Sequence, residues 1–290
     1  MIVSTISRRC ILRKQTSGIL RVSSIRQLTS NTKSTKENIP TKFSLAEYRH
    51  VYPEFIPDPN VEFRNPIREK LERLDMLSRR AHIDIPEFYV GSILAVTSMD
   101  KHSPNKTNKF VGICIKREGC GLRAKFILRN VIDHQGVEVL YEMYDPVLSK
   151  IEVLRLEKRL DDELFYLRDA LPEYSTFDSN MEPEIHPEGA PIPINPIKVK
   201  LKPRPWLERW ERKDLKGIEQ IDLPERFFIR AKELATPWEK YDMMKQYMKT
   251  IPEEEQTEIF AEIQQQLQQL ELTRKKLKRK RTFIKPVKLA

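Results

Sequence analysis

The stretch "GICIKREGCGLRAKFILRNVI" at residues 112–132 decides the fold class of this chain. Apolar and polar residues alternate on both sides of the Gly-rich turn "EGCG", and an alternation with period two predicts a β-hairpin. In this hairpin Ile113 and Ile115 lie on one face, and Phe126 and Leu128 are the expected matching pair on the second strand. A soluble hairpin needs one such apolar face.

The hairpin also carries a cluster of cations that its fold does not require: Lys116, Arg117, Arg123, Lys125 and Arg129. Lys and Arg on a rigid strand pair suit binding to phosphate oxygens. Gly119 and Gly121 permit a positive φ and a close backbone approach by a partner. A solvated charged edge that prevents aggregation would explain the same residues. From the hairpin alone both interpretations stay open.

The hairpin belongs to a longer run, residues 88–155, in which five short β-rich segments are separated by turns. Strands of this length are best buried in a small closed or half-closed barrel, since closure removes exposed sheet edges. A short helix is expected to follow at residues 156–174. Asp161 or Asp162 lies near its start, where a carboxylate complements the helix dipole.

A helix is also predicted before the barrel. Asn65 can cap it and Pro66 suits its first turn. Four apolar residues then follow at helical spacing and form one stripe: Ile67, Leu71, Leu74 and Leu77.

A last helix is predicted at residues 252–282, because Pro252 and three Glu residues suit a helix N-terminus. Its apolar stripe consists of Ile259, Ile263, Leu267, Leu270 and Leu277. Such a helix can dock on protein while its basic end reaches phosphate; a solvated charge run is the alternative. The candidate phosphate contacts at this end are Lys275, Lys276, Lys278 and Arg279.

These elements divide the chain into five parts. They are a transit peptide at 1–36, a linker and helix at 37–87, the barrel with the following short helix at 88–171, a Pro-rich segment at 172–205, and a helical extension with a basic end at 206–290. The Pro-rich segment has little core of its own and is expected to run extended over another surface. The predicted fold class is a mainly β core, a small SH3-like barrel, with flanking helices and long extended N- and C-terminal extensions.

The net charge of +10 is concentrated at the two ends of the chain. Residues 1–36 hold eight Lys and Arg, residues 274–290 hold nine, and neither segment holds an acidic residue. Like charges in blocks indicate a polyanionic partner, with a solvated tail as the alternative. The first segment is rich in Arg and Ser and free of acids, which is typical of a mitochondrial transit peptide; a disordered basic arm is the alternative.

No catalytic constellation stands out, so we expect neither an enzyme, nor a cofactor, nor a bound metal. The three cysteines follow no metal or disulfide spacing. Cys114 is expected in the core, and Cys120 is expected to be a reduced thiol in the turn. The five histidines are scattered along the chain. No stretch approaches the roughly 20 apolar residues of a membrane span.

The order of motifs resembles the bacterial-type large-subunit ribosomal protein nineteen family, in its mitochondrial form. The resemblance covers roughly residues 83–215. Its residues are Phe110 and Gly112, Gly119 and Gly121, Phe126 and Arg129, Gly136, Val137 and Glu138, Asp145 and Pro146, and Tyr166, Leu167 and Arg168.

The resemblance implies an SH3-like barrel embedded in the large ribosomal subunit near the face that meets the small subunit. It implies contacts with ribosomal RNA and neighbouring proteins, no catalysis, and a location in the mitochondrial matrix. The implied RNA contacts are Lys116, Arg117, Arg123, Lys125, Arg129 and Arg168. This chain departs from the bacterial pattern in its net acidic middle and its long extension, which suggests fewer RNA contacts per residue and more protein contacts.

The leading hypothesis is therefore a structural protein of the mitochondrial large ribosomal subunit. An RNA-dependent maturation or modification factor that docks through its barrel is the first alternative, and it needs a catalytic constellation in residues 180–290 that we do not find. A matrix adaptor without RNA contacts is the second.

Overall fold

The computed structural model describes residues 52–187 and 190–282. The predicted transit peptide at 1–36 and the linker up to residue 51 lie outside the described residues. The core is an antiparallel sheet in the order β4-β3-β2-β1-β5. Its strands are β1 (Ile93–Met99), β2 (Thr107–Glu118), β3 (Lys125–Ile132), β4 (Gln135–Glu142) and β5 (Leu148–Arg155).

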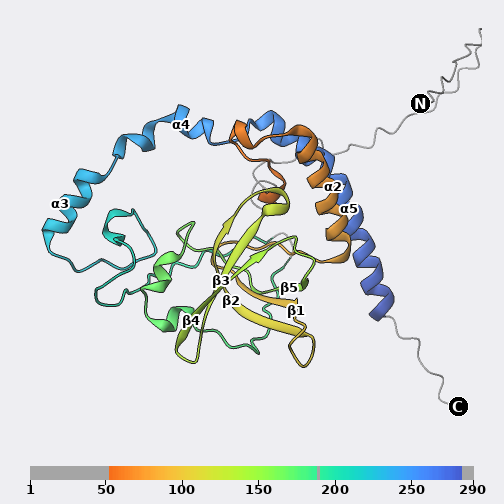
Figure 1. The fold of residues 1–290 in the computed structure, drawn as a ribbon, viewed down its shortest axis with the longest axis horizontal. Helices are drawn as coiled ribbons and strands as arrows, with labels where there is room; N and C mark the ends of the chain where they lie inside the picture. Colours follow the sequence, from red (N-terminus) through yellow and green to blue (C-terminus); the bar gives the residue numbers. More distant parts are fainter. Residues whose placement is uncertain (1–51, 188–189, 283–290) are drawn as a thin grey trace, which may run out of the picture. The chain divides into compact units, whose positions relative to one another are not determined.

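All five predicted strands are present, and the mainly β core with flanking helices is confirmed. Figure 1 shows the sheet at the centre of the fold with α2 (Pro66–His82) and α5 (Glu253–Thr282) beside it. Within the described residues β4 and β5 are the two edges of the sheet and do not pair. The sheet is therefore not closed within these residues.

The predicted pairing inside the hairpin is wrong. A register shift between Cys114 and Lys116 places Leu128 opposite Cys114 and Phe126 opposite Arg117. A β-bulge adds one residue to one strand and so moves the residues after it to the other face. Arg117 consequently lies on the same face as Cys114 and Phe126, and Lys116 lies on the face of Ile127.

Both faces of the sheet are buried, which is why alternation could not identify the matching set. On one face Cys114, Phe126 and Leu128 pack with Met76 of α2 and Ile263 of α5. On the other face Ile113 and Ile115 form a second cluster, to which the later chain contributes further residues. These are Leu164, Tyr166, Leu167, Ala170, Val199 and Trp210. The two-sided core therefore draws on segments from both ends of the described chain.

The helix α2 begins as predicted, since the Asn65 side chain accepts hydrogen bonds from the backbone N–H groups of Ile67 and Arg68. Its predicted apolar stripe is mostly wrong, because Ile67, Leu71 and Leu74 are exposed and only Leu77 is buried. The face turned to the sheet instead holds Met76, Leu77 and Arg80. A charged residue replaces an apolar one on the buried face, and periodicity in hydrophobicity cannot detect this.

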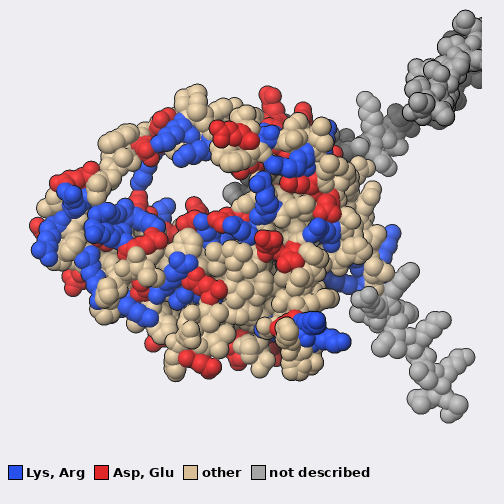
Figure 2. Space-filling model, in the orientation of Figure 1, with Lys and Arg blue, Asp and Glu red and all other residues tan. Residues whose placement is uncertain are grey.

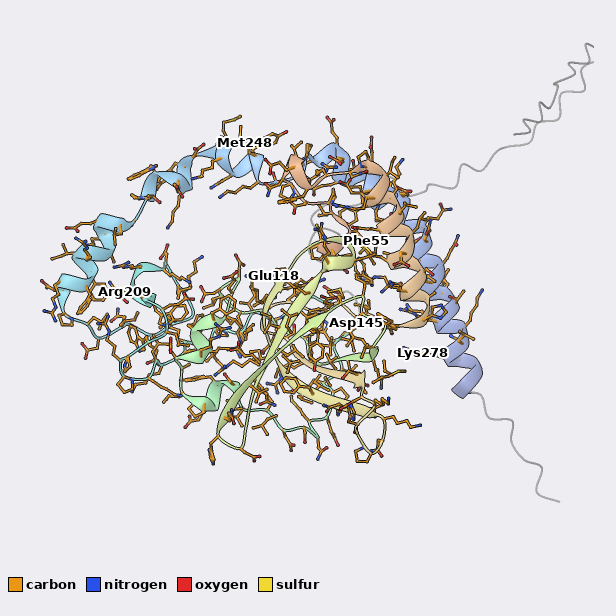
Figure 3. The ribbon with its side chains drawn as sticks, viewed as in Figure 1. Phe55, Glu118, Asp145, Arg209, Met248 and Lys278 are labelled. Carbon is orange, nitrogen blue, oxygen red and sulfur yellow. The ribbon has the colours of Figure 1, made fainter. Side chains whose placement is uncertain are left out.

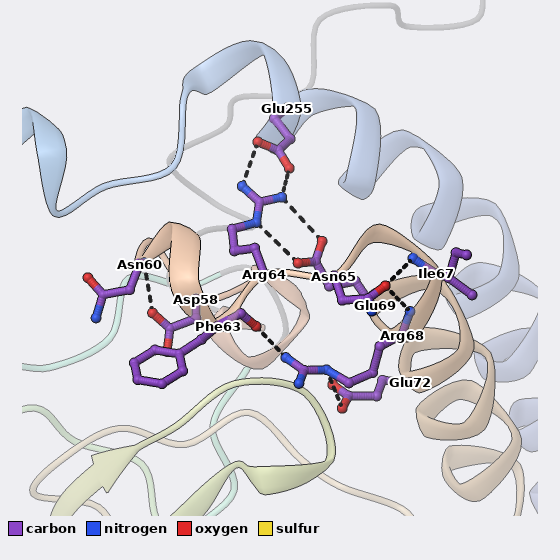
Figure 4. A network of polar contacts seen from close by, with 10 residues as sticks. All are labelled: Asp58, Asn60, Phe63, Arg64, Asn65, Ile67, Arg68, Glu69, Glu72 and Glu255. Atoms are coloured by element: carbon purple, nitrogen blue, oxygen red, sulfur yellow. Dashed lines mark hydrogen bonds and ion pairs between the residues drawn. The ribbon is translucent and has the colours of Figure 1, made fainter.

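The C-terminal helix α5 packs on the chain's own core. Ile259 and Ile263 are buried, whereas Leu277 near its end is exposed. Figure 4 shows how its first turn is tied to the start of α2: the Arg64 guanidinium binds Glu69 and also Glu255. Arg274 forms a second tie by donating to the Ile83 carbonyl at 2.9 Å.

No α-helix forms in the described residues where a short helix is expected at 156–174; two 3-10 turns, η4 (Phe165–Arg168) and η5 (Pro172–Ser175), lie there. Asp161 does not complement a helix dipole. Its carboxylate accepts hydrogen bonds from the backbone N–H groups of Lys216 and Gly217 at 2.9 and 2.8 Å. Long-range hydrogen bonds to the extension thus replace local helical ones.

The part of the extension that contains Val199 and Trp210 lies on the second face of the sheet. Asp169 Oδ2 accepts hydrogen bonds from the indole Nε1 of Trp210 at 2.7 Å and from the Leu207 backbone N–H at 3.0 Å. The Pro-rich segment runs extended over the chain's own core, where Val199 is buried. The remaining elements are η1 (Pro53–Phe55), η2 (Val61–Phe63), η3 (Gly121–Arg123), η6 (Trp210–Arg212), α3 (Glu225–Leu234), η7 (Pro237–Tyr241) and α4 (Met243–Met248).

We expect Trp210→Ala to lower the free energy of unfolding by about 3–5 kcal/mol, since it removes a buried aromatic side chain and one of the hydrogen bonds that Asp169 accepts. The matched control is Trp238→Ala, because Trp238 is 67% exposed and its loss is expected to change stability by no more than about 0.5 kcal/mol. Chemical denaturation of the purified chain measures both. Equal losses in the two variants would show that the extension does not complete the core.

Candidate nucleic-acid interface

The tip of the β2–β3 hairpin is packed against the chain's own N-terminal segment. Gly119 and Gly121 have positive φ values of 83° and 62°, as the turn requires. A Cβ on Gly119 would lie 2.5 Å from the Arg123 carbonyl oxygen, and one on Gly121 would collide with the Glu72 carboxylate of α2. The close approach that these glycines allow is therefore made to the chain itself.

Arg117 is occupied by an internal ion pair. Its Nη2 lies 2.6 Å from Oε2 of Glu54, a carboxylate whose side chain is 1% exposed, and its Nη1 donates to the Phe88 carbonyl at 2.7 Å. The other carboxylate oxygen of Glu54 accepts from Arg80. Figure 3 labels Glu118, at the end of β2, and Phe55, in the 3-10 turn that also contains Glu54.

Lys116 and Lys125 share an acidic partner, Glu118, on the face of the sheet opposite to Arg117. The Nζ atoms of Lys116 and Lys125 lie 2.7 and 2.9 Å from the Glu118 carboxylate, and Lys116 also approaches Glu163 at 3.3 Å. Hydrogen bonds from the two lysines hold the pKa of Glu118 below its usual range. Both lysines remain partly exposed, so an RNA phosphate could still reach them.

Arg129 and Arg168 converge on Glu138. Arg129 Nη1 lies 2.8 Å and Arg168 Nη2 lies 2.6 Å from the carboxylate, which is 21% exposed. Burial alone would raise the pKa of Glu138, but the hydrogen bonds and charges of the two arginines outweigh it and lower that pKa. Ion pairs thus connect three residues of the family motif: Arg129 of β3, Glu138 of β4 and Arg168 of η4.

Arg123 differs from the other hairpin cations. It is exposed at the end of η3, and within the described part of the chain its side chain makes no hydrogen bond or ion pair. Among the five hairpin cations it is the one without an ion-pair partner in the described residues.

The basic end of α5 is exposed at Lys275, Lys276, Lys278 and Arg279. Lys278 is labelled near the C-terminal end of this helix in Figure 3. These residues follow Arg274, which ties α5 to the loop after α2. The structure thus fixes the helix up to the point where its exposed cations begin.

The sequence reading missed the acidic partners of these cations and a further basic segment. Glu54 lies 63 residues before Arg117, and no spacing rule connects them. The segment "KVKLKPR" at 198–204 alternates Lys with buried or half-buried apolar residues; that alternation is a signal for a charged outward face. Figure 2 shows Lys and Arg interspersed with Asp and Glu over much of the visible surface.

No cluster of three or more His, Cys, Asp or Glu side chains that could hold a metal ion occurs in the described residues. No described helix is long and apolar enough to cross a membrane. Cys114 is buried, and burial raises the pKa of its thiol to about 12; this confirms its expected place in the core.

We expect the stability contributed by Glu138 to be lost in acid. Because its pKa is lower in the folded chain than the ordinary 4.5, this stability is present above about pH 4.5 and disappears as the pH falls through the folded value. Glu138→Gln should lower the free energy of unfolding by about 2 kcal/mol at pH 7, and by less below pH 4. Glu142→Gln, on an exposed position of the same strand, is the control. A pH-independent difference from the wild type would refute this role.

Comparison with known proteins places the barrel motifs in a family. The family model for ribosomal protein L19 matches residues 69–176. The chain is 70% identical over 247 residues to the large ribosomal subunit protein bL19m of Drosophila melanogaster, an alignment that covers 84% of this chain and 81% of the relative.

Two further relatives match over a shorter stretch of the chain. Large ribosomal subunit protein bL19 of Malacoplasma penetrans is 36% identical over 93 residues, which are 32% of this chain and 64% of that protein. Protein bL19c of Spinacia oleracea is 30% identical over 93 residues, 32% of this chain and 40% of that protein. The chain belongs to the ribosomal protein L19 family, in its mitochondrial form.

Proposed function

We propose that the chain is a structural constituent of the large subunit of the mitochondrial ribosome, where it binds ribosomal RNA and neighbouring ribosomal proteins in the matrix. The observation that carries this proposal is the 70% identity to the Drosophila protein bL19m over 84% of the chain. An alignment of 247 residues extends well beyond the barrel, so it includes a large part of the extension.

The proposal assigns different roles to the predicted RNA contacts. Arg123 binds RNA phosphate from the hairpin tip, with Lys116 and Lys125 beside it as partly neutralised cations. Arg117, Arg129 and Arg168 act mainly within the fold, as their ion pairs indicate. The exposed lysines and arginine at the end of α5 are a second RNA-facing group.

Contacts with neighbouring proteins are supported by the segment from α3 to α4. Every residue from 232 to 250 is exposed, and Trp238, Tyr241 and Met243 are 67, 83 and 80% exposed. Aromatic residues and Met are enriched in the cores of protein interfaces. The proposal further includes a place near the small subunit, as the family resemblance implies, and no catalytic role.

A sucrose gradient of mitochondrial extract tests the assignment. A structural constituent is expected to co-migrate with the large subunit after a high-salt wash. Release of the protein to the top of the gradient would favour a transient maturation factor or an adaptor. Crosslinks from the chain to small-subunit proteins in the intact ribosome test the subunit contact, and their absence would contradict it.

We expect Arg123→Glu to reduce incorporation into the large subunit several-fold, because it reverses the one hairpin charge that has no ion-pair partner among the described residues. Lys101→Glu is the matched control: Lys101 is an exposed cation in the loop before β2, at the opposite end of that strand from η3. Both variants should keep the wild-type unfolding free energy. Equal incorporation of the two variants would remove Arg123 as an RNA contact.

A further inference from the structure

The segment at residues 198–216, here called the cationic strip, holds eight Lys and Arg against three acidic residues. It lies beyond residue 176, where the match to the family model ends. Figure 2 shows Lys and Arg gathered in the area where Figure 3 labels Arg209 of this strip.

The three acids of the strip are already neutralised by other cations. Glu208 pairs with Lys213, Glu211 with Arg204, and Asp214 with Lys240 outside the strip, at 2.5, 3.3 and 2.6 Å. Six cations are left that make no side-chain hydrogen bond or ion pair within the described residues. They are Lys198, Lys200, Lys202, Arg209, Arg212 and Lys216. This excess of positive charge contrasts with the barrel, where most cations have a carboxylate partner.

Three of these cations stand on one face of an extended backbone. The backbone of residues 198–202 is hydrogen-bonded on both sides. The Val199 N–H donates to the Gly217 carbonyl at 2.8 Å, and the Lys202 N–H donates to the Asp169 carbonyl at 2.7 Å. Val199 is buried and Leu201 is half-buried, so Lys198, Lys200 and Lys202 project to solvent. Alternate residues of a strand are about 6.6 Å apart, which gives a regular row of positive charges.

The strip is held firmly on the core. Asp169 accepts a hydrogen bond from the indole of Trp210, which is 3% exposed, and Asp161 accepts hydrogen bonds from the backbone N–H groups of Lys216 and Gly217. A row of cations that is positioned before binding loses little conformational freedom when a partner docks. The strip therefore has the geometry of a preformed site rather than of a loose tail.

We propose that the cationic strip binds the sugar-phosphate backbone of RNA in the assembled large subunit. The outward face of 198–202 presents lysines alone, and Lys is depleted in the cores of protein interfaces, whereas Lys and Arg contacts to phosphate position a protein on nucleic acid without reading sequence. The proposal rests on the proposed function, which brings the chain into an RNA-rich particle.

The first test is protein–RNA crosslinking of wild-type large subunits, followed by mass spectrometry of the crosslinked peptides. RNA crosslinks in peptides that span residues 198–216 are expected. Crosslinks from these residues to an acidic protein segment instead, in a chain that stays with the particle, would overturn the inference and leave the proposed function intact. Loss of the chain from the salt-washed particle would overturn both.

The second test compares two triple variants of the full chain. Lys198→Gln/Lys200→Gln/Lys202→Gln removes three unpaired charges, and Lys213→Gln/Lys240→Gln/Lys245→Gln removes three that are paired with carboxylates. Binding to large-subunit ribosomal RNA transcripts is measured over a range of salt concentrations.

The slope of log affinity against log salt is expected to fall by about 2–3 in the first variant, at about 0.7–0.9 per phosphate contact. The control variant should keep a slope close to that of the wild type. Equal slopes in the two variants would refute the strip as an RNA site, and near-native unfolding transitions in both would exclude misfolding as the reason.

Discussion

The carboxylate of Glu54 is the interaction on which the hairpin side of this structure depends. It is nearly inaccessible to solvent and accepts hydrogen bonds from Arg80 of α2 and Arg117 of β2. A buried carboxylate is costly unless it is paired, so this one fixes three segments at once. The N-terminal 3-10 turn, the first helix and the hairpin are thereby joined into one face of the core.

This constraint changes the role of the basic residues in the hairpin, because it limits how far they are available to phosphate. In a chain whose barrel carried few acids, the same arginines would be available to phosphate. Here Glu54, Glu118 and Glu138 form ion pairs with five of the six cations that the family resemblance implies as RNA contacts. Among the described residues, cations without an ion-pair partner include Arg123 and six members of the cationic strip. The net acidic middle of the chain is consistent with this division between folding and binding.

Periodicity in the sequence correctly predicted the features that depend on neighbouring residues. All five strands, the Asn65 cap and the buried start of the stripe in α5 were predicted because each follows from neighbouring residues. The hairpin register was wrong because both faces of the sheet are apolar and a bulge shifts the phase. The helix expected at 156–174 was wrong because Asp161 and Asp169 bind groups in the extension, 38 to 56 residues away.

The candidate site was predictable only in part. Gly119, Gly121 and the hairpin cations could be identified from their positions around one turn. The partner of Arg117 could not, because Glu54 lies 63 residues away and an ion pair between residues far apart leaves no periodic trace in the sequence. The apolar residues of α2 illustrate the same limit: three of the four predicted for the core are exposed, and Arg80 takes a buried place because Glu54 is there to receive it.

A double-mutant cycle between Glu54 and Arg117 tests most directly that the hairpin cations serve the fold. Unfolding free energies of Glu54→Gln, Arg117→Met and the double variant give the coupling energy between the two side chains. A coupling of about 1.5–3 kcal/mol is expected for a buried charge-assisted hydrogen bond. A coupling near zero, with unfolding free energies that stay at the wild-type value, would contradict the account and return Arg117 to the group of cations available to RNA.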